Sequence, residues 1–292
     1  MSVDGDTAGA ADQGFAFIQQ ILPQQWLSRT MHRLARSRHP LVRGLLLRTV
    51  LGAYPQIDMS EAVQPDPYAY ESFNAFFTRA LRPAARTVTL VPEEVASPVD
   101  GTVSQLGRIE AGSLVQAKGM RYTTAALLAD EAAAARYAGG SFACLYLAPY
   151  NYHRIHMPLA GRLTAARYVP GDLYSVNAAT ARAIPNLFAR NERVVCEFET
   201  SLGPLAMIFV GALFVGSIET VFAGEINPPP VRGGAVRAIV GGIGRDYARG
   251  EEIGRFNMGS TVVALFGREA TFAPQFGPGA TVRLGQALAR IG

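Results

Sequence analysis

Three short segments of this 292-residue chain carry side chains that could act together in one reaction. Asp100 lies in Ser-Pro-Val-Asp-Gly, where an expected strand meets a turn. His153 and His156 stand three residues apart, and Ser260 follows Gly259 at the start of an apolar run. A serine hydroxyl is a poor nucleophile at neutral pH unless a base takes its proton and a carboxylate orients that base. Asp100, His156 and Ser260 would form such a set.

Each of these residues also has a plainer interpretation. Asp100 alone is typical of a turn. The two histidines could bind a metal ion, but no third ligand is apparent, so we expect no metal site. His153 could also be a hydrogen-bonded histidine of the protein core. Spacing alone leaves these alternatives open.

The elements that would position these residues are mostly strands. Apolar or alternating segments of strand length, separated by Gly, Pro and Asp, occupy 96–107, 141–149, 162–172, 193–213 and 259–267. We also expect a helix at 71–86, broken by Pro83, and another at 123–137. In the C-terminal segment 278–292, turns and strands alternate in the order turn–strand–turn–strand, which is typical of barrel-sandwich folds. We therefore predict a mainly β (α+β) fold, with a barrel-sandwich-like antiparallel core forming one catalytic domain over 58–292.

The N-terminal part has a different character. Residues 1–13 are polar and are expected to form a disordered tail without a signal peptide. Residues 14–57 contain six arginines and no acidic residue, and Pro23 and Pro40 divide them into short helices. On the second helix one face is apolar and the opposite face carries arginines; the apolar side chains are Trp26, Leu27, Met31, Leu34 and Ala35. These helices could dock on the protein's own core, or they could bind a membrane surface.

Composition excludes several classes of protein. With 49% hydrophobic and 17% charged residues, the chain is expected to fold, and its mean hydropathy of +0.14 suggests membrane contact. The uncharged run 201–218 is interpreted as buried strands, with a membrane span as the alternative. Cys144 and Cys196 are expected to be buried, without zinc or a disulfide framework, which suits a cytoplasmic compartment. Lys118 is the one lysine, so any lysine Schiff base has a single candidate.

Several motifs together resemble the phosphatidylserine decarboxylase family, in its compact bacterial form. They are FNAFFTR, SPVDG, QAKG, YHRIHMP, YVPGDLYSVN, VGSIETVFAG and FNMGSTVVALF, and they extend over nearly the whole chain. The last contains the Gly-Ser-Thr of the family's self-cleavage site. Met258 stands where the family usually has leucine, a change that nearly conserves volume.

The resemblance implies that Ser260 attacks the carbonyl of Gly259, so that the chain is cut into a β chain 1–259 and an α chain 260–292. His156 would take the Ser260 proton and Asp100 would orient His156. Glycine suits this step because it lacks a Cβ and its backbone tolerates strain. Ser260 would become a pyruvoyl group whose carbonyl forms a Schiff base with the substrate amine, with no need for pyridoxal phosphate or a metal. His153 is the expected proton donor, with Ser175 as a weaker partner.

The same resemblance implies the partners. Phosphatidylserine would be the substrate and phosphatidylethanolamine the product, and an anionic membrane surface would bind the N-terminal helices. We expect a peripheral protein on the cytoplasmic face of the bacterial inner membrane, built as a heterodimer of the two cleaved chains. Higher oligomers stay open, and no nucleic acid is expected to bind.

Two rival functions remain. One is a serine hydrolase that uses the same three residues on an external substrate without self-cleavage, although Asn-Met-Gly-Ser-Thr lacks the second glycine of a nucleophile elbow. The other is a non-catalytic carrier or binding module, for which Lys118 would be the modified residue.

Overall fold

The computed structural model describes residues 9–117, 119–213, 217–226, 234–257 and 260–292. The three long helices all lie at the N-terminus: α1 (Ala10–Ile21), α2 (Gln24–Ala35) and α3 (Pro40–Ala53). Short helices follow, namely α4 (Phe73–Phe77), α5 (Thr124–Leu128), α6 (Glu131–Ala135), α7 (Ala178–Ala183) and α8 (Leu187–Arg190), with a single 3-10 turn at Pro67–Ala69.

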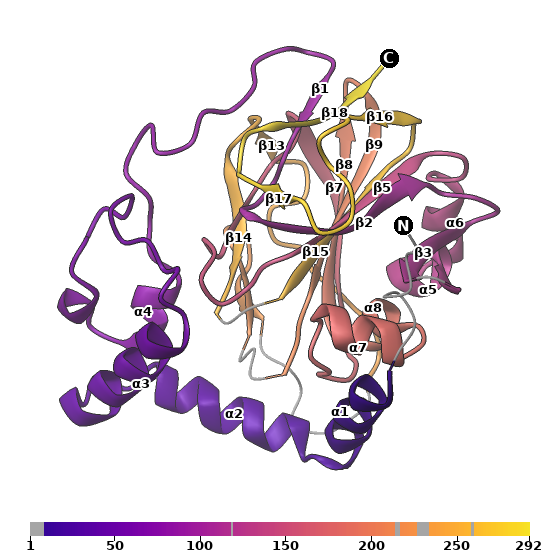
Figure 1. Ribbon diagram of the computed structural model, residues 1–292. Coiled ribbons are helices and arrows are strands. Elements are labelled where there is room, and N and C mark those ends of the chain that lie inside the picture. Colours follow the sequence, from indigo (N-terminus) through magenta and orange to yellow (C-terminus); the bar gives the residue numbers. More distant parts are fainter. Residues whose placement is uncertain (1–8, 118, 214–216, 227–233, 258–259) are drawn as a thin grey trace.

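A nine-stranded antiparallel sheet forms the centre of the molecule (Figure 1). Its strands follow the order β12-β7-β8-β9-β15-β5-β2-β17, with β13 also paired to β7. In chain order they are β2 (Gly101–Arg108), β5 (Ser141–Tyr146), β7 (Gly161–Val169), β8 (Arg193–Thr200), β9 (Gly203–Val210), β12 (Arg237–Ala238), β13 (Asp246–Tyr247), β15 (Thr261–Phe266) and β17 (Thr281–Val282).

Two smaller antiparallel sheets pack against one face of this sheet, and they share one hydrophobic core with it. One consists of β1 (Glu94–Ala96), β18 (Ala287–Ile291) and β16 (Ala270–Phe272); the other consists of β11 (Gly224–Ile226), β10 (Ile218–Thr220), β14 (Glu252–Phe256) and β6 (Arg154–His156). The opposite face is covered by the hairpin of β3 (Ser113–Ala117) and β4 (Met120–Thr123) and by helices. The predicted mainly β fold with N-terminal helices is confirmed, as a layered sandwich whose described strands close no barrel.

Burial on both faces explains why several strands are uniformly apolar. In β15, Val262 and Ala264 face the core under the smaller sheets, while Val263 and Leu265 face the helix-covered side. A strand covered on both faces has no polar alternation to show. The uncharged run 201–218 contains β9, whose residues 205–210 are at most 1% exposed, so the interpretation as buried strands is confirmed.

Two helix predictions were too long. The segment 123–137 forms α5 and α6 instead of one helix, because Ala129 takes a left-handed conformation and the Asp130 side chain accepts a hydrogen bond from the Ala133 N–H to start a new helix. The segment 71–86 is helical only in α4, which Ser72 caps and Thr78 ends, well before Pro83.

The N-terminal helices lie in a row along one end of the sheet (Figure 1). Pro23 precedes α2 and Pro40 begins α3, so the predicted division is confirmed. Helix α1 begins at Ala10, inside the segment predicted to be a tail, whereas residues 1–8 lie outside the described residues. Across the part of the chain that the structure describes, no helix combines the length and the apolar character needed to cross a membrane.

Candidate active site

Ser260 directly precedes β15 in the middle of the large sheet. Its carbonyl oxygen accepts a hydrogen bond from the Leu147 N–H at 2.9 Å, which continues the ladder between β15 and β5 by one residue. Ser260 is 0% exposed, and its Oγ makes no hydrogen bond within the described chain. Buried hydroxyl groups nearly always have a partner, so this one calls for an explanation. The Ser260 hydroxyl thus lies beside its own main chain, shielded from solvent and without a hydrogen-bond partner among the described residues.

His156 ends β6, and both of its ring nitrogens have partners. Nδ1 lies 2.8 Å from the carbonyl oxygen of Gly250, and Nε2 lies 3.3 Å from the Tyr152 hydroxyl. A carbonyl only accepts, so Nδ1 carries the proton and Nε2 is the acceptor in the neutral ring. Burial is the main cause that lowers the pKa of His156. The ring is therefore neutral near pH 7, with Nε2 as its basic atom.

Asp100 lies in the turn between β1 and β2, where it is held by an arginine. Arg86 donates to both carboxylate oxygens, with 2.9 Å from Nε to Oδ1, and the Leu284 N–H donates to Oδ1 at 2.8 Å. The side chains of Arg86 and Asp100 are only 9% and 11% exposed. This buried ion pair holds the turn in place, because burying either charge without the other would cost several kcal/mol of free energy, roughly 3–5.

The predicted Asp100, His156 and Ser260 are not joined by hydrogen bonds to one another among the described contacts. Asp100 and His156 are close in the fold, since the His156 N–H donates to the carbonyl of Pro98 at 2.9 Å. The charge of Asp100 is also among the influences that raise the pKa of His156 against the effect of burial. Asp100 thus acts on the His156 ring through space, while Arg86 holds its carboxylate.

His153 is fully buried behind Phe77. The two rings are stacked with 4.0 Å between centroids, and Nε2 lies 3.1 Å from the carbonyl oxygen of Ala148. Nδ1 has no partner among the described residues. Burial, and then the nearby charge of Arg79, lower the pKa of His153 to about 3. A purely structural buried histidine would be expected to satisfy both nitrogens, so the free Nδ1 favours a chemical role.

A cavity of about 360 Å³ adjoins these residues. Its wall includes Leu147, whose N–H holds Ser260, and Phe77, which covers His153. Ser175 also lines it, and the remaining wall comes from α3 and from the segments around 146–149, 176–177 and 212–213. Ser175 therefore lines a cavity whose wall also holds Leu147 and Phe77, the residues that contact Ser260 and His153, beside an N-terminal helix.

Several residues of this region were not predicted. The partners of the two histidines and of Asp100 were missed: Phe77, Arg86, Tyr152 and Gly250. Tyr152 had a signal, since it stands four residues before His156 in the same motif. Arg86 and Gly250 come from distant segments, and no local pattern connects them to the site.

Two predicted residues, Gly259 and Lys118, lie outside the described residues. Within the described ranges, no three histidine, cysteine, aspartate or glutamate side chains gather as a metal site would require. The expectation of a metal-free reaction stays a prediction. Cys144 and Cys196 are both buried and free, as expected, and burial raises the pKa of the Cys144 thiol to about 12.

Helices α1 and α2 bury polar side chains and expose apolar ones. Gln19 accepts from the Ser175 N–H at 2.7 Å and donates to Thr180 Oγ1 at 3.2 Å, and Gln24 accepts from the Leu173 N–H at 2.9 Å. Trp26, by contrast, is 64% exposed. The other exposed apolar side chains of α1 to α3 are Phe15, Phe17, Ile18, Ile21, Leu34, Leu41 and Leu45. So many large apolar side chains exposed on three successive helices favour an interaction surface there.

Comparison with known proteins shows the family of this chain. A family model described as phosphatidylserine decarboxylase matches residues 73–290, and a second, described as PSD, matches residues 15–55. The chain is 49% identical over 282 residues to a protein of Shewanella frigidimarina (strain NCIMB 400), covering 94% of this chain and 96% of that protein. It is 51% identical over 281 residues to a protein of Shewanella sp. (strain MR-4), covering 94% and 95%.

A relative from Methylococcus capsulatus (strain ATCC 33009 / NCIMB 11132 / Bath) is 48% identical over 277 residues, again covering 94% of this chain and 95% of that protein. All three relatives carry the name phosphatidylserine decarboxylase proenzyme. By both the family model and these relatives, the chain belongs to the phosphatidylserine decarboxylase family.

Proposed function

We propose that this protein decarboxylates phosphatidylserine to phosphatidylethanolamine, with a pyruvoyl group that it makes from its own Ser260. The observation that carries the proposal is the buried Ser260 hydroxyl, which has no hydrogen-bond partner among the described residues. The carbonyl of the same residue is bonded to Leu147 of the cavity wall. The word proenzyme in the names of the relatives agrees with a chain that matures by cleavage.

Self-cleavage would begin with attack of Ser260 Oγ on the Gly259 carbonyl carbon. The new C–O bond forms, the C–N bond breaks, and the hydroxyl proton reaches the freed nitrogen by way of a base. Loss of the Ser260 Cα proton then breaks the Cβ–O bond, which leaves the Gly259 carboxylate and a dehydroalanine. Water converts the dehydroalanine into the pyruvoyl group and ammonia.

His156 is the proposed base. Its neutral ring, with Nδ1–H held by Gly250, leaves Nε2 able to take a proton. To do so, Nε2 must exchange the Tyr152 hydroxyl for the Ser260 hydroxyl. Asp100, held by Arg86, stabilises the protonated ring through its charge.

The pyruvoyl carbonyl supplies an electron sink for the bond that loses carbon dioxide. The chain's own residues would then place the substrate and deliver a proton. His153 is the proposed proton donor and Ser175, on the cavity wall, its weaker partner. Since burial lowers the pKa of His153, its ring must gain a proton when the anionic substrate enters.

The burial of Ser260 disfavours the serine-hydrolase alternative. A hydrolase would need its substrate to reach Ser260 in the uncut chain, yet Ser260 is 0% exposed there. In the proposed reaction the lipid meets this residue only after the cut has separated it from Gly259. The carbonyl of the preceding residue needs no access route. An intramolecular attack is thus compatible with burial where an external one is not.

The exposed apolar side chains of α1 to α3 support binding to an anionic membrane surface. The substrate has two acyl chains, and Val50 of α3 and Tyr54 directly after it form part of the cavity wall. Polar Gln19 and Gln24 tie the helices to the body, which leaves the apolar side chains for lipid. Location on the cytoplasmic face, and a heterodimer of cleaved chains, follow as parts of the same proposal.

The test is Ser260→Ala, with Ser201→Ala in the exposed β8–β9 turn as control. Wild type and S201A should yield fragments 1–259 and 260–292 on a denaturing gel, and the smaller one should lack a free amino terminus by mass. S260A should stay one chain and release no carbon dioxide from phosphatidylserine. A wild-type protein that stays whole yet decarboxylates the lipid would overturn the proposal.

A further inference from the structure

Asn257 lies two residues before Gly259, where the proposed cut is made, and both its main chain and its side chain are hydrogen-bonded. It is 1% exposed, and its Nδ2 donates to Ser217 Oγ at 2.6 Å while its Oδ1 accepts from Asn74 Nδ2 at 3.2 Å. Its backbone N–H also donates to the carbonyl of Ser217 at 3.3 Å. Three contacts to two distant segments fix both the main chain and the side chain at this position.

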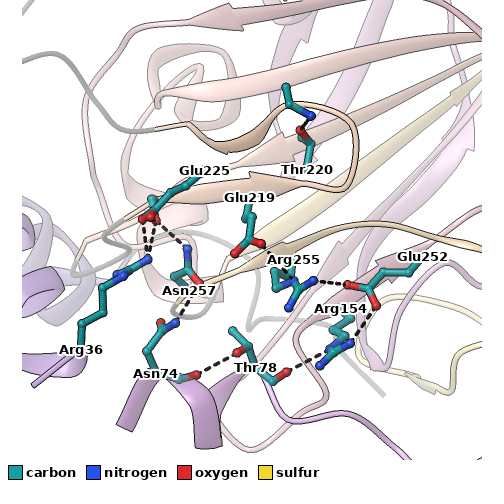
Figure 2. A network of polar contacts seen from close by, with 12 residues as sticks. Arg36, Asn74, Thr78, Arg154, Glu219, Thr220, Glu225, Glu252, Arg255 and Asn257 are labelled. Atoms are coloured by element: carbon teal, nitrogen blue, oxygen red, sulfur yellow. Dashed lines mark hydrogen bonds and ion pairs between the residues drawn. The ribbon is translucent and has the colours of Figure 1, made fainter. Parts of the chain in front are cut away.

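One arm of this network leads to helix α2 (Figure 2). Ser217 Oγ donates to the carboxylate of Glu225, which also accepts from Arg36 and, at 2.7 Å, from His32. The His32 hydrogen bond is the largest cause that lowers the pKa of Glu225 to about 2, against the effect of burial. Glu225 is therefore an anion throughout the neutral range, and it joins α2 to the residue that holds Asn257.

The other arm leads to strand β6, which begins at Arg154 and ends at His156 (Figure 2). Thr78 donates to the Asn74 carbonyl at 2.9 Å, and its own carbonyl accepts from Arg154 Nε at 2.9 Å. Arg154 stands between His153 and His156 and donates to Glu252 Oε2 at 2.9 Å. Asn257 thus lies midway between α2 and β6 in one connected set of polar contacts.

We propose that Asn257 is a positioning residue for self-cleavage, and that Glu225 links the seating of helix α2 to that step. The inference rests on the proposed function. Asn257 anchors the chain on one side of the scissile bond, and the Leu147 N–H anchors Ser260 on the other. Fixing both ends of a three-residue step limits the conformations from which the hydroxyl attacks, and such restriction is a large source of rate.

This role separates maturation from decarboxylation. Once the chain is cut, Asn257 lies near the new C-terminus of the β chain. The peptide bond that it helped to position is then gone. Loss of its contacts should slow the cut and leave the turnover of cut molecules unchanged. A residue that only stabilised the fold would lower both together, along with the unfolding temperature.

The experiment follows self-cleavage of freshly synthesised full-length chain in detergent. Asn257→Ala should slow the appearance of the two fragments on the order of 10- to 100-fold. Glu225→Gln keeps the shape but removes the charge that Arg36 and His32 contact, and it should slow cleavage by a smaller factor. Glu269→Gln is the matched control, because its ion pair with Arg108 is exposed and distant from these contacts. It should cleave like wild type.

Treatment with hydroxylamine distinguishes a positioning role of Asn257 from a merely structural one. It cuts an ester but not an amide, so it releases fragments from any chain in which the Ser260 hydroxyl has already attacked. Chains of N257A that are stalled before the attack should resist it. Full release by hydroxylamine would place the delay after the attack and overturn the positioning role.

The remaining outcomes are also decisive. Wild-type cleavage together with equally fast N257A and E225Q would refute the inference and leave the proposed function standing. A wild type that is never cut between 259 and 260 would instead refute the proposed function. If N257A fails to fold, E225Q decides: slow cleavage at an unchanged unfolding temperature supports the link, and wild-type cleavage removes it.

Discussion

The ring of Phe77 lies on the ring of His153, with 4.0 Å between the centroids and 24° between the planes. Phe77 also lines the cavity, so the stacked pair of rings borders the space in which a substrate would lie. Behind it, the Ala148 carbonyl engages Nε2 and leaves Nδ1 free. The stack therefore belongs to an environment that buries the histidine and lowers its pKa to about 3.

His153→Asn should separate the two reactions of this protein. Asparagine keeps a polar amide in the place of the first ring atoms, so the fold should persist, but no group remains that can transfer a proton at Nδ1. We expect self-cleavage near the wild-type rate and decarboxylation reduced on the order of 10²- to 10⁴-fold. A gel and a carbon dioxide assay on the same sample measure both. Full decarboxylation by H153N would make His153 a structural residue.

Self-cleavage should depend on pH through His156. Burial lowers its pKa in the folded chain below the ordinary 6.5, so the ring is a neutral base throughout the neutral range. The rate of cleavage should be flat above pH 6.5 and fall only in more acidic solution, as the ring gains a proton. Rates of cleavage measured from pH 4.5 to 8.5 test this, and a midpoint above 6.5 would contradict it. In His156→Ala the residual rate should lose this acid limb.

Glu192 gives a pH dependence of stability that is unrelated to catalysis. It is 1% exposed, Tyr168 donates to its Oε2 at 3.0 Å, and Oε1 has no partner in the described chain. Burial raises its pKa from 4.5 to about 7, despite the opposing hydrogen bond. The folded state thus favours the protonated acid, and its stability should be full below pH 4.5 and decline as the pH rises to 7.

Glu192→Gln should remove this decline. At pH 8 the variant should be more stable than wild type, by on the order of 3 kcal/mol at 1.36 kcal/mol per pKa unit. Urea unfolding at pH 5 and pH 8 measures the difference. Glu199→Gln in β8, the strand that directly follows Glu192, is a control, because the Glu199 side chain is half exposed. A wild type whose stability does not fall relative to E192Q between these pH values would contradict the assignment.

The strands and the N-terminal helices could be predicted because their signals are local. Apolar runs bounded by Gly, Pro and Asp marked β5, β8, β9 and β15, and Pro23 and Pro40 marked the starts of α2 and α3. The extra break at Asp130 was missed because a capping side chain in an alanine-rich segment changes little in the apolar pattern.

The candidate site residues were predicted from residue type and resemblance, but the contacts that hold them in place were not. Arg86, Gly250 and Phe77 contact Asp100, His156 and His153 from segments 14 to 94 positions away. Such pairs depend on how the sheets pack, which periodicity does not encode. The sequence also did not predict which side of α2 packs on the protein. Its arginine face and its apolar face could be recognised from the sequence. The burial of Gln24 and Ser28, however, depends on partners in the rest of the protein.

The exposed side chains of α1 and α3 offer a sharper test of membrane binding than removal of the helices, since Gln19 and Gln24 bind the body and their loss would disturb it. Ile21 and Leu41 are 69% and 73% exposed. Full burial of such a side chain in lipid contributes roughly 1.5–3 kcal/mol, so Ile21→Gln and Leu41→Gln should each weaken binding to anionic vesicles about tenfold or more.

Trp26 reports on this binding directly, because it is the single tryptophan of the chain and lies 64% exposed on α2. Its emission should shift to the blue as anionic vesicles are added, and the shift should need more lipid in I21Q and L41Q. Leu90→Gln is the matched control, since Leu90 is 86% exposed but lies outside these helices. If L90Q weakens binding as much as I21Q and L41Q do, or if those two variants bind like wild type, the helices do not form the membrane-binding surface.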